Sequence, residues 1–213
     1  MTIFDLVLLF TVLGCVLALF SLCYFLLRRQ WTLVRRVSLA LGSFLVLYAV
    51  VLLSVSLLSP QHLLAMHQDR CFEDWCLAVE RVVQQPTVGA SPTIVTARGE
   101  FYLVTVRVSS RAKVISQRAL DAQVYLLDAS SQRYNLSPTG QQALDATGQG
   151  GQPLSSELVP GGSFTRTVVF DLPKGAAHLA MAVTHGLFPD LLVIGSEQSF
   201  LHKPTLIELQ LAG

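Results

Sequence analysis

The sequence predicts a membrane α-helical hairpin followed by an all-β domain, an antiparallel sandwich with one short inserted helix. Two long apolar runs that together contain a single charged residue predict the hairpin, and a later alternation of apolar and polar residues, interrupted by turn formers, predicts the strands. The composition agrees, because 52% of the 213 residues are hydrophobic and only 14% are charged. Such a chain holds one ordinary domain and an additional, more apolar part.

Residues 1–60 contain the two apolar runs, 4–27 and 37–58. Asp5 is the single charged residue in the first run, and the second has none. Each run exceeds the ~20 residues that an α-helix needs to cross ~30 Å of hydrocarbon. We therefore expect a two-helix transmembrane hairpin, with Asp5 at the outer boundary where its carboxylate reaches water.

The loop 28–36 holds the positive charges of this region, Arg28, Arg29, Arg35 and Arg36, together with Trp31. Positive loops stay in the cytoplasm and tryptophan favours the membrane interface, so the loop is predicted to be cytoplasmic. The N-terminus and everything after residue 60 then lie outside. The sequence thus predicts a multi-pass protein of the cytoplasmic (inner) membrane with a periplasmic or extracellular domain.

Two alternatives for the apolar runs fit less well. A cleaved signal peptide over residues 1–27 would need a basic start, a shorter apolar core and a small-residue cleavage site. A buried helical hairpin in a soluble protein would need more apolar partner surface than the remaining residues provide. Small residues four apart, Gly14 with Ala18 and Ser38 with Gly42, are expected to pack the two helices together, with an oligomer interface as the alternative.

Residues 61–70 are expected to be a juxtamembrane linker, after which Cys71 and Cys76 are the two cysteines outside the helices. An oxidising compartment favours a disulfide, which requires a turn across residues 72–75 because five extended residues span ~17 Å. A zinc site that adds His62 and His67 is an alternative. A redox-active pair is another, although such pairs use C-x-x-C at a helix start.

Residues 71–213 show period-two alternation, broken at intervals of about ten residues, which is typical of an Ig-like sandwich of about eight strands. The turn formers include the Pro-Gly-Gly run at 160–162. The chain between 138 and 146 is helix-compatible and predicts the inserted helix. The expected strands cover 77–83, 104–108, 120–126, 132–134, 164–170, 179–183, 191–194 and 206–211.

Between Phe101 and Leu211 the sequence resembles bacterial exported immunoglobulin-like (telokin-like) domains of unknown function. The resemblance rests on four segments: 101–106, 126–128 with 132–134, the Pro160-Gly161 turn, and 168–173. It implies a sandwich that is usually tethered to the outer face of a membrane, often through a lipobox cysteine, whereas this chain has two helices. It carries no catalytic residues.

Charge and motifs exclude several function classes. The four cations Arg107, Arg111, Lys113 and Arg118 form a modest cluster, read as the solvated edge of a strand, so no nucleic acid is expected. No nucleophile elbow, zinc-protease motif or phosphate-binding glycine loop occurs. We therefore expect no enzyme, no catalytic residue, no cofactor and no metal.

The sequence favours a membrane-anchored interaction or scaffold protein whose outer domain binds another exported or membrane protein, with membrane lipid as the other partner. The alternative is an accessory transmembrane subunit of a transporter or signalling complex. In that case the hairpin acts, and Arg28, Arg29, Trp31, Arg35 and Arg36 contact lipid or the partner.

Overall fold

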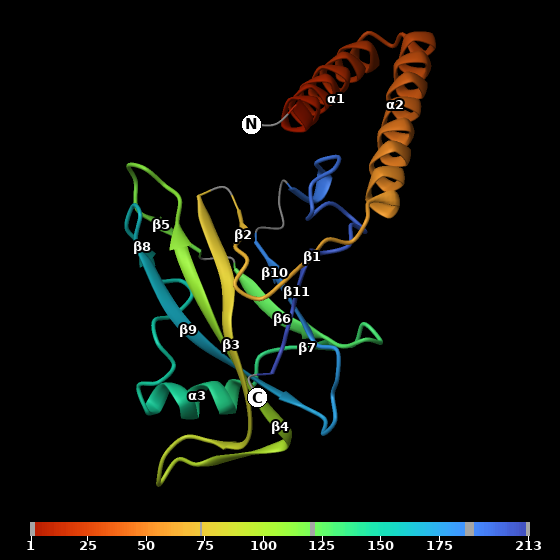
Figure 1. Cartoon of the computed structure of the whole chain (residues 1–213). Coiled ribbons are helices and arrows are strands. Elements are labelled where there is room, and N and C mark those ends of the chain that lie inside the picture. The colour runs from red at the N-terminus through yellow and green to blue at the C-terminus, as the bar shows by residue number, and fades with distance from the viewer. Residues whose placement is uncertain (1–2, 73, 120–121, 186–189, 212–213) are drawn as a thin grey trace. The chain divides into compact units, whose positions relative to one another are not determined.

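The computed structural model describes residues 3–72, 74–119, 122–185 and 190–211 (Figure 1). The chain folds as two compact units. The first combines Met1–Pro60 with Gly186–Lys203, and the second combines Gln61–His185 with Pro204–Gly213. Two parts of the predicted elements lie outside the described residues. They are residues 1–2 of the hairpin region and residues 120–121 of the strand expected at 120–126.

The first unit contains α1 (Ile3–Leu27), α2 (Trp31–Leu58) and the short 3₁₀ helix η1 (Asp190–Leu192). The turn between α1 and α2 is tight, because the Arg29 N–H already donates to the Leu26 carbonyl at 3.0 Å. Helix α2 begins six residues before the apolar run, so Arg35 and Arg36 stand on its first turns rather than in a loop. The loop expected at 28–36 is thus reduced to residues 28–30.

Both helices are long and apolar enough to cross a membrane. Only 6% and 11% of their most apolar windows are buried, so protein does not cover them as it covers the core helix of a soluble domain. Added Cβ atoms at Gly14 and Gly42 would meet nothing within 4 Å. The expectation that these small residues pack α1 against α2 is therefore wrong.

The second unit is built from three sheets, and two of them form the two layers of a sandwich. The first layer has the strand order β1 (Leu63–Leu64), β11 (Leu206–Glu208), β10 (Ala180–Thr184), β6 (Gln123–Leu127), β7 (Arg133–Tyr134). The second layer has the order β2 (Arg70–Cys71), β3 (Trp75–Val88), β4 (Val95–Ser110), β9 (Ser163–Leu172). The third sheet pairs β5 (Gln117–Arg118) with β8 (Glu157–Leu158).

The core lies between the two layers and follows the predicted alternation. On β4, Tyr102, Val104 and Val106 are fully buried and share one cluster with Leu126 of β6 and Met181 of β10. Because successive residues of a strand point to opposite faces, their neighbours on β4 face outward. The β-sandwich is thus confirmed.

Helix α3 (Pro138–Ala146) covers part of the outer face of the second layer. Its Ala143 and Leu144 pack with Phe101 and Val169 in a second apolar cluster. The predicted inserted helix is therefore present. The segment around it also pairs with the free edge of β9, since the Ser137 N–H donates to the Val169 carbonyl at 2.8 Å. Such a covered edge protects a sheet from pairing with other chains.

Cys71 and Cys76 form a disulfide, as the sequence predicts, and their Cα atoms lie 3.9 Å apart on the paired strands β2 and β3. The Phe72 N–H donates to the Trp75 carbonyl at 2.8 Å, which closes the expected turn. Both thiols are used in this bond, so the alternative zinc site with His62 and His67 does not form.

Two predictions of organisation differ from the structure. The linker expected at 61–70 contributes β1 and the start of β2 to the sandwich. The strand expected at 191–194 is absent, because Asp190–Leu192 forms a 3₁₀ helix and belongs to the unit of α1 and α2. A short apolar run does not by itself distinguish a strand from another buried segment.

Candidate functional site

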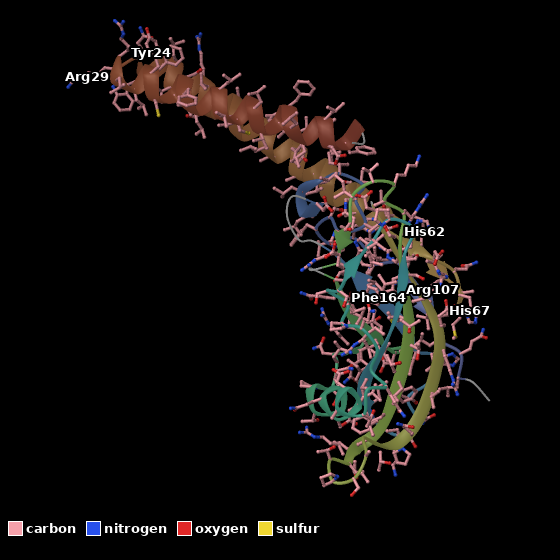
Figure 2. The ribbon with its side chains drawn as sticks, turned by 90° about the vertical axis from the view of Figure 1, so that its left-hand side faces the viewer. Tyr24, Arg29, His62, His67, Arg107 and Phe164 are labelled. Atoms are coloured by element: carbon pink, nitrogen blue, oxygen red, sulfur yellow. A yellow bond between two sulfur atoms is a disulfide. The ribbon has the colours of Figure 1, made fainter. Side chains whose placement is uncertain are left out.

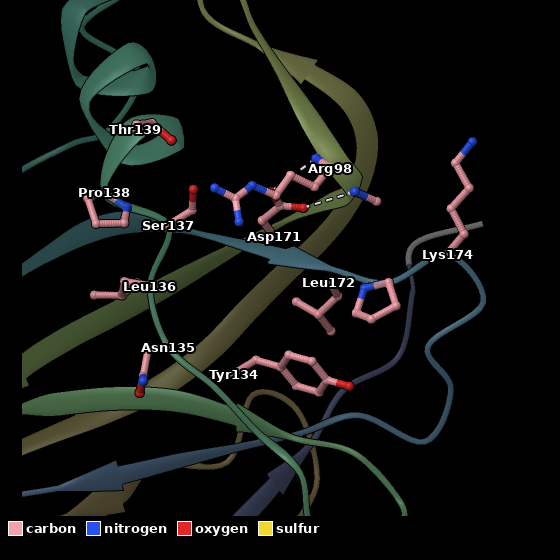
Figure 3. Close-up of a pocket in the computed structure, with 12 residues that line it drawn as sticks. Arg98, Tyr134, Asn135, Leu136, Ser137, Pro138, Thr139, Asp171, Leu172 and Lys174 are labelled. Carbon is pink, nitrogen blue, oxygen red and sulfur yellow. Dashed lines mark hydrogen bonds between the residues drawn. The ribbon is translucent and has the colours of Figure 1, made fainter.

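A cleft of about 810 Å³ opens at one end of the sandwich (Figure 3). Three parts of the chain line it: the start of β4 at Arg98–Gly99, the connection from β7 into α3, and the end of β9 with the turn after it. The cleft therefore lies where both layers end, and it belongs entirely to the second unit.

The floor of the cleft is fixed by Asp171 of β9. Its two carboxylate oxygens accept hydrogen bonds from the backbone N–H groups of Arg98 at 3.1 Å and Gly99 at 3.2 Å. A Cβ atom on Gly99 would lie 2.0 Å from the Leu172 carbonyl oxygen. Only glycine allows β4 and β9 to approach this closely.

Two cations stand at the cleft, Arg98 and Lys174, and both are exposed. Within the described part of the chain neither has an ion-pair partner, since Asp171 is engaged by backbone donors rather than by their side chains. Figure 3 places Lys174 and the first turn of α3 at opposite ends of the cleft. The cleft thus holds two cationic side chains without an ion-pair partner and one carboxylate, Asp171, which is bound by backbone N–H groups.

The N-terminus of α3 adds to this charge. Ser137 is the N-cap, its hydroxyl oxygen accepts the Gly140 N–H at 3.3 Å, and Pro138 follows in the first turn. Ser137, Pro138 and Thr139 line the cleft. The partial positive charge of a helix N-terminus therefore faces the same space as the two cations.

Apolar and hydroxyl groups complete the walls. Leu136 remains 37% exposed at the cleft, next to Asn135 and opposite Leu172. The Tyr134 hydroxyl donates to Asp128 at 3.0 Å, and burial together with this hydrogen bond raises the pKa of Tyr134. Tyr134 thus stays neutral at physiological pH and contributes no negative charge.

Among the residues that line the cleft there is no histidine or cysteine, and the Ser137 hydroxyl serves as the cap of α3.

The cationic cluster expected at Arg107, Arg111, Lys113 and Arg118 is divided by ion pairs. Arg107 contacts Glu80 at 2.7 Å and Asp69 at 3.1 Å, and Arg118 contacts Glu157 at 3.1 Å. The hydrogen bond from Arg107 lowers the pKa of Glu80. No concentrated basic face results on the described surface of the sandwich.

His67, which is labelled with Arg107 in Figure 2, joins this network, since its Nδ1 lies 3.3 Å from the second oxygen of Glu80. Arg107 and His67 thus bind the same carboxylate from different sides. The network fastens the chain before β2 to the outer face of the second layer.

The residues predicted to set the topology gather at the turn of the hairpin. Arg29 stands in the turn beside Tyr24 (Figure 2), and the Arg28 guanidinium lies 5.6 Å from the centre of the Tyr24 ring. Trp31, at the start of α2, is 69% exposed. Arg35 and Arg36 are exposed on the next turns. The residues that line the cleft are distant in sequence from those of the hairpin turn. They match no motif, so the sequence analysis did not identify them as a site.

Comparisons with known proteins give no family. No family model and no curated protein matches the chain. Among solved structures, the yjhA protein from Bacillus subtilis is 13% identical, with a TM-score of 0.47 over 69% of this chain and 99% of that one. The secreted protein MPT63 from Mycobacterium tuberculosis is 12% identical, with a TM-score of 0.43 over 61% and 93%.

A third solved structure, an uncharacterised β-sandwich protein from Clostridium difficile, is 8% identical, with a TM-score of 0.44 over 71% of this chain and 96% of that one. With identities and TM-scores this low, the similarities carry no argument about function.

Proposed function

We propose that the protein is a membrane-anchored interaction module. Helices α1 and α2 span the cytoplasmic membrane, and an Ig-like sandwich outside the cytoplasm binds an acidic segment of another exported or membrane protein in the cleft. The observation that carries this proposal is the pair of exposed cations, Arg98 and Lys174, on a cleft whose one lining acid, Asp171, is hydrogen-bonded to backbone N–H groups rather than to their side chains.

The membrane anchor is supported by the exposed apolar surface of the hairpin. Side chains such as Phe10, Phe20 and Leu47 are more than 60% exposed, which water penalises at about 25 cal/mol for each Å². The arginines gather at the turn, so the positive-inside rule directs the turn to the cytoplasm and residue 61 to the outer side. A disulfide in the outer domain agrees with an oxidising compartment.

The chemistry of the cleft selects the ligand class. Arg98, Lys174 and the start of α3 attract negative charge, and Asn135 offers an amide for hydrogen bonds to a peptide backbone. Leu136 and Leu172 provide apolar contact. An extended segment with acidic side chains meets all these groups, whereas a neutral apolar ligand would leave the cations unpaired.

The binding test uses the full-length chain in its native membrane with a photo-crosslinking residue in place of Asn135. We expect a cross-linked partner whose attachment site, mapped by mass spectrometry, lies in an acidic segment. The double variant Arg98→Ala, Lys174→Ala should weaken capture at least about tenfold, because one charge-assisted hydrogen bond contributes roughly 1.5 kcal/mol or more.

The matched control removes two exposed cations of the same domain, Arg111→Ala with Lys113→Ala, and should leave capture unchanged. Absence of a cross-linked partner, or equal loss in both double variants, would contradict the proposal. Topology is tested separately with a membrane-impermeant thiol reagent on intact cells. Ser130→Cys should be labelled from outside and Gln30→Cys should not.

A groove on α2 favours a second candidate function, that of an accessory transmembrane subunit. The groove has a volume of about 480 Å³ and lies along Ser38, Gly42 and Val46. Small residues at such spacing let another helix approach closely. In this case Gly42→Leu should abolish co-purification of the partner and Gly14→Leu should not, whereas the cleft variants should have no effect.

A further inference from the structure

In the sequence, the segment Asp190–Lys203 lies between the two parts of the sandwich unit, Gln61–His185 and Pro204–Gly213. It nevertheless packs on the helices. Leu52 and Ser56 are the buried residues of α2, and with Tyr48 they stand four residues apart on one helix face. Val193 and Ile194 of the segment are buried at 5% and 8% exposure. The segment is therefore part of the helical unit.

Two polar contacts fasten the segment to α2. The Tyr48 hydroxyl donates to the Leu192 carbonyl at 2.6 Å, and the hydroxyls of Ser56 and Ser199 lie 2.8 Å apart. Ser56 and Ser199 are 0% and 4% exposed. Buried hydroxyls of this kind satisfy each other, so the contact specifies one position of the segment along the helix.

The segment satisfies part of its backbone internally. Consecutive turns place N–H donors on nearby carbonyls, including Val193 to Asp190 at 3.1 Å and Phe200 to Leu191 at 3.0 Å. Irregular backbone at membrane depth requires such partners, and these turns supply several of them.

Three large apolar side chains on the segment remain uncovered. Leu192, Phe200 and Leu201 are 39%, 50% and 55% exposed. Leu201 also has a φ of 62°, a left-handed conformation that costs a non-glycine residue about 1–3 kcal/mol. The backbone is thus held in an unfavourable conformation at a residue that presents an apolar side chain outward.

The segment contacts the outer half of the apolar run of α2. This run begins at residue 37, directly after Arg36, and about 20 residues cross the hydrocarbon layer, so Ser56 lies near the outer interface. Tyr48 is eight residues before Ser56, which corresponds to about 12 Å along a helix. The segment therefore contacts α2 from the outer interface into the outer leaflet.

We infer that Asp190–Lys203 is an interfacial membrane anchor, which lies on the outer end of α2 and inserts Leu192, Phe200 and Leu201 into the outer leaflet. This inference rests on the proposed membrane-spanning hairpin. Lipid is the occupant because the three side chains continue the exposed apolar surface of α1 and α2. Asp190, Glu197 and Lys203 limit how deeply the segment lies, since charges at the bilayer centre are costly.

The test is the depth of spin labels in the full-length chain, reconstituted in bilayers of phosphatidylethanolamine and phosphatidylglycerol. Cys15→Ala and Cys23→Ala remove the free thiols and leave the disulfide intact. Single cysteines then replace Phe200 and Leu201. Leu45→Cys, within α2, reports on the hairpin, and Ser130→Cys reports on the water-exposed sandwich.

We expect labels at 200 and 201 to be several-fold more accessible to oxygen, relative to a water-soluble nickel complex, than the label at 130. If they match residue 130 while the label at 45 lies in lipid, the inference fails and the membrane hairpin stands. If the label at 45 is also water-accessible, the hairpin itself fails. Labels at 200 and 201 that neither reagent reaches would mean that protein covers them, which also overturns the lipid assignment.

Discussion

The Gly99 N–H donates to the Asp171 carboxylate at 3.2 Å, across the two strands that form the floor of the cleft. The same glycine leaves no room for a Cβ atom, since the Leu172 carbonyl oxygen would lie 2.0 Å away. One residue thus sets both the approach of β4 to β9 and the position of Arg98 beside it.

Replacing this glycine should destabilise the sandwich. We expect Gly99→Ala to lower the free energy of unfolding by about 1–3 kcal/mol, the usual cost of overpacking, and to weaken capture at the cleft. Chemical denaturation monitored by tryptophan fluorescence measures the first effect. Thr96→Ala, at an exposed position of the same strand, is the control, and an equal loss there would contradict the explanation.

The helix cap at the cleft gives a second prediction. Ser137→Ala removes the side-chain acceptor for the Gly140 N–H, so we expect a loss of about 1 kcal/mol in unfolding free energy. Thr139→Ala changes a neighbouring exposed hydroxyl that makes no described hydrogen bond, and it should cost less than half as much. Equal effects in denaturant titrations would show that Ser137 does not act as the cap.

The disulfide provides a third prediction. Closing a five-residue separation restricts the unfolded chain by about 2 kcal/mol in the chain-entropy account. We expect the double variant Cys71→Ala, Cys76→Ala, or reduction of the wild type, to lower stability by this order. The control is the double variant Cys15→Ala, Cys23→Ala, which removes only free thiols. Because it keeps the disulfide, reductant should lower its stability by the same amount as that of the wild type.

The Glu80–Arg107 pair predicts a pH dependence. Because the hydrogen bond from Arg107 lowers the pKa of Glu80 below its ordinary 4.5, the pair contributes stability above that value. The contribution is lost as pH falls through the lowered pKa of the folded state. Partial exposure limits it to about 1 kcal/mol or less.

Denaturation of the wild type and of Glu80→Gln between pH 3 and 7 checks this contribution. The variant should be less stable near neutrality, and the difference should shrink at low pH. Glu208→Gln, an exposed acid on β11 without a described ion pair, should show no such convergence. A pH-independent difference at Glu80 would contradict the assignment.

The contact between Tyr48 and Leu192 yields a fifth prediction. Tyr48→Phe removes the donor to the Leu192 carbonyl, and one hydrogen bond contributes about 1 kcal/mol, or roughly a fivefold change in a local opening equilibrium. We expect correspondingly faster amide hydrogen exchange in residues 193–202 of the full chain in bilayers. Tyr24→Phe, whose hydroxyl has no described partner, should leave the exchange unchanged.

Local patterns predicted much of this fold and little of the site. The hairpin, the disulfide turn and the alternation on β4 each depend on neighbouring residues, so the sequence alone contained their signal. The cleft depends on Arg98, Ser137 and Lys174, which come together only because β4 and β9 pair and α3 packs beside them. Neither the composition nor the spacing of residues in the sequence predicts that these three residues lie close together.

For the segment 190–203, in contrast, the sequence pattern gave a clear prediction that was wrong. Its apolar run at 191–194 resembles a strand, but this run belongs to the unit of α1 and α2 rather than to the sandwich. A pattern records that a side chain is apolar and does not record which surface will cover it.

The register of β10 and β11 gives this segment a practical meaning for protein production. Ala182 and Leu206 are direct partners on antiparallel strands, so the chain leaves and re-enters the sandwich at neighbouring points. Residues 186–203 are thus an insertion in what would otherwise be a β-hairpin. A soluble form should begin near Gln61 and replace the insertion by a short turn, because truncation of α1 and α2 alone would leave Val193 and Ile194 without their cover and favour aggregation.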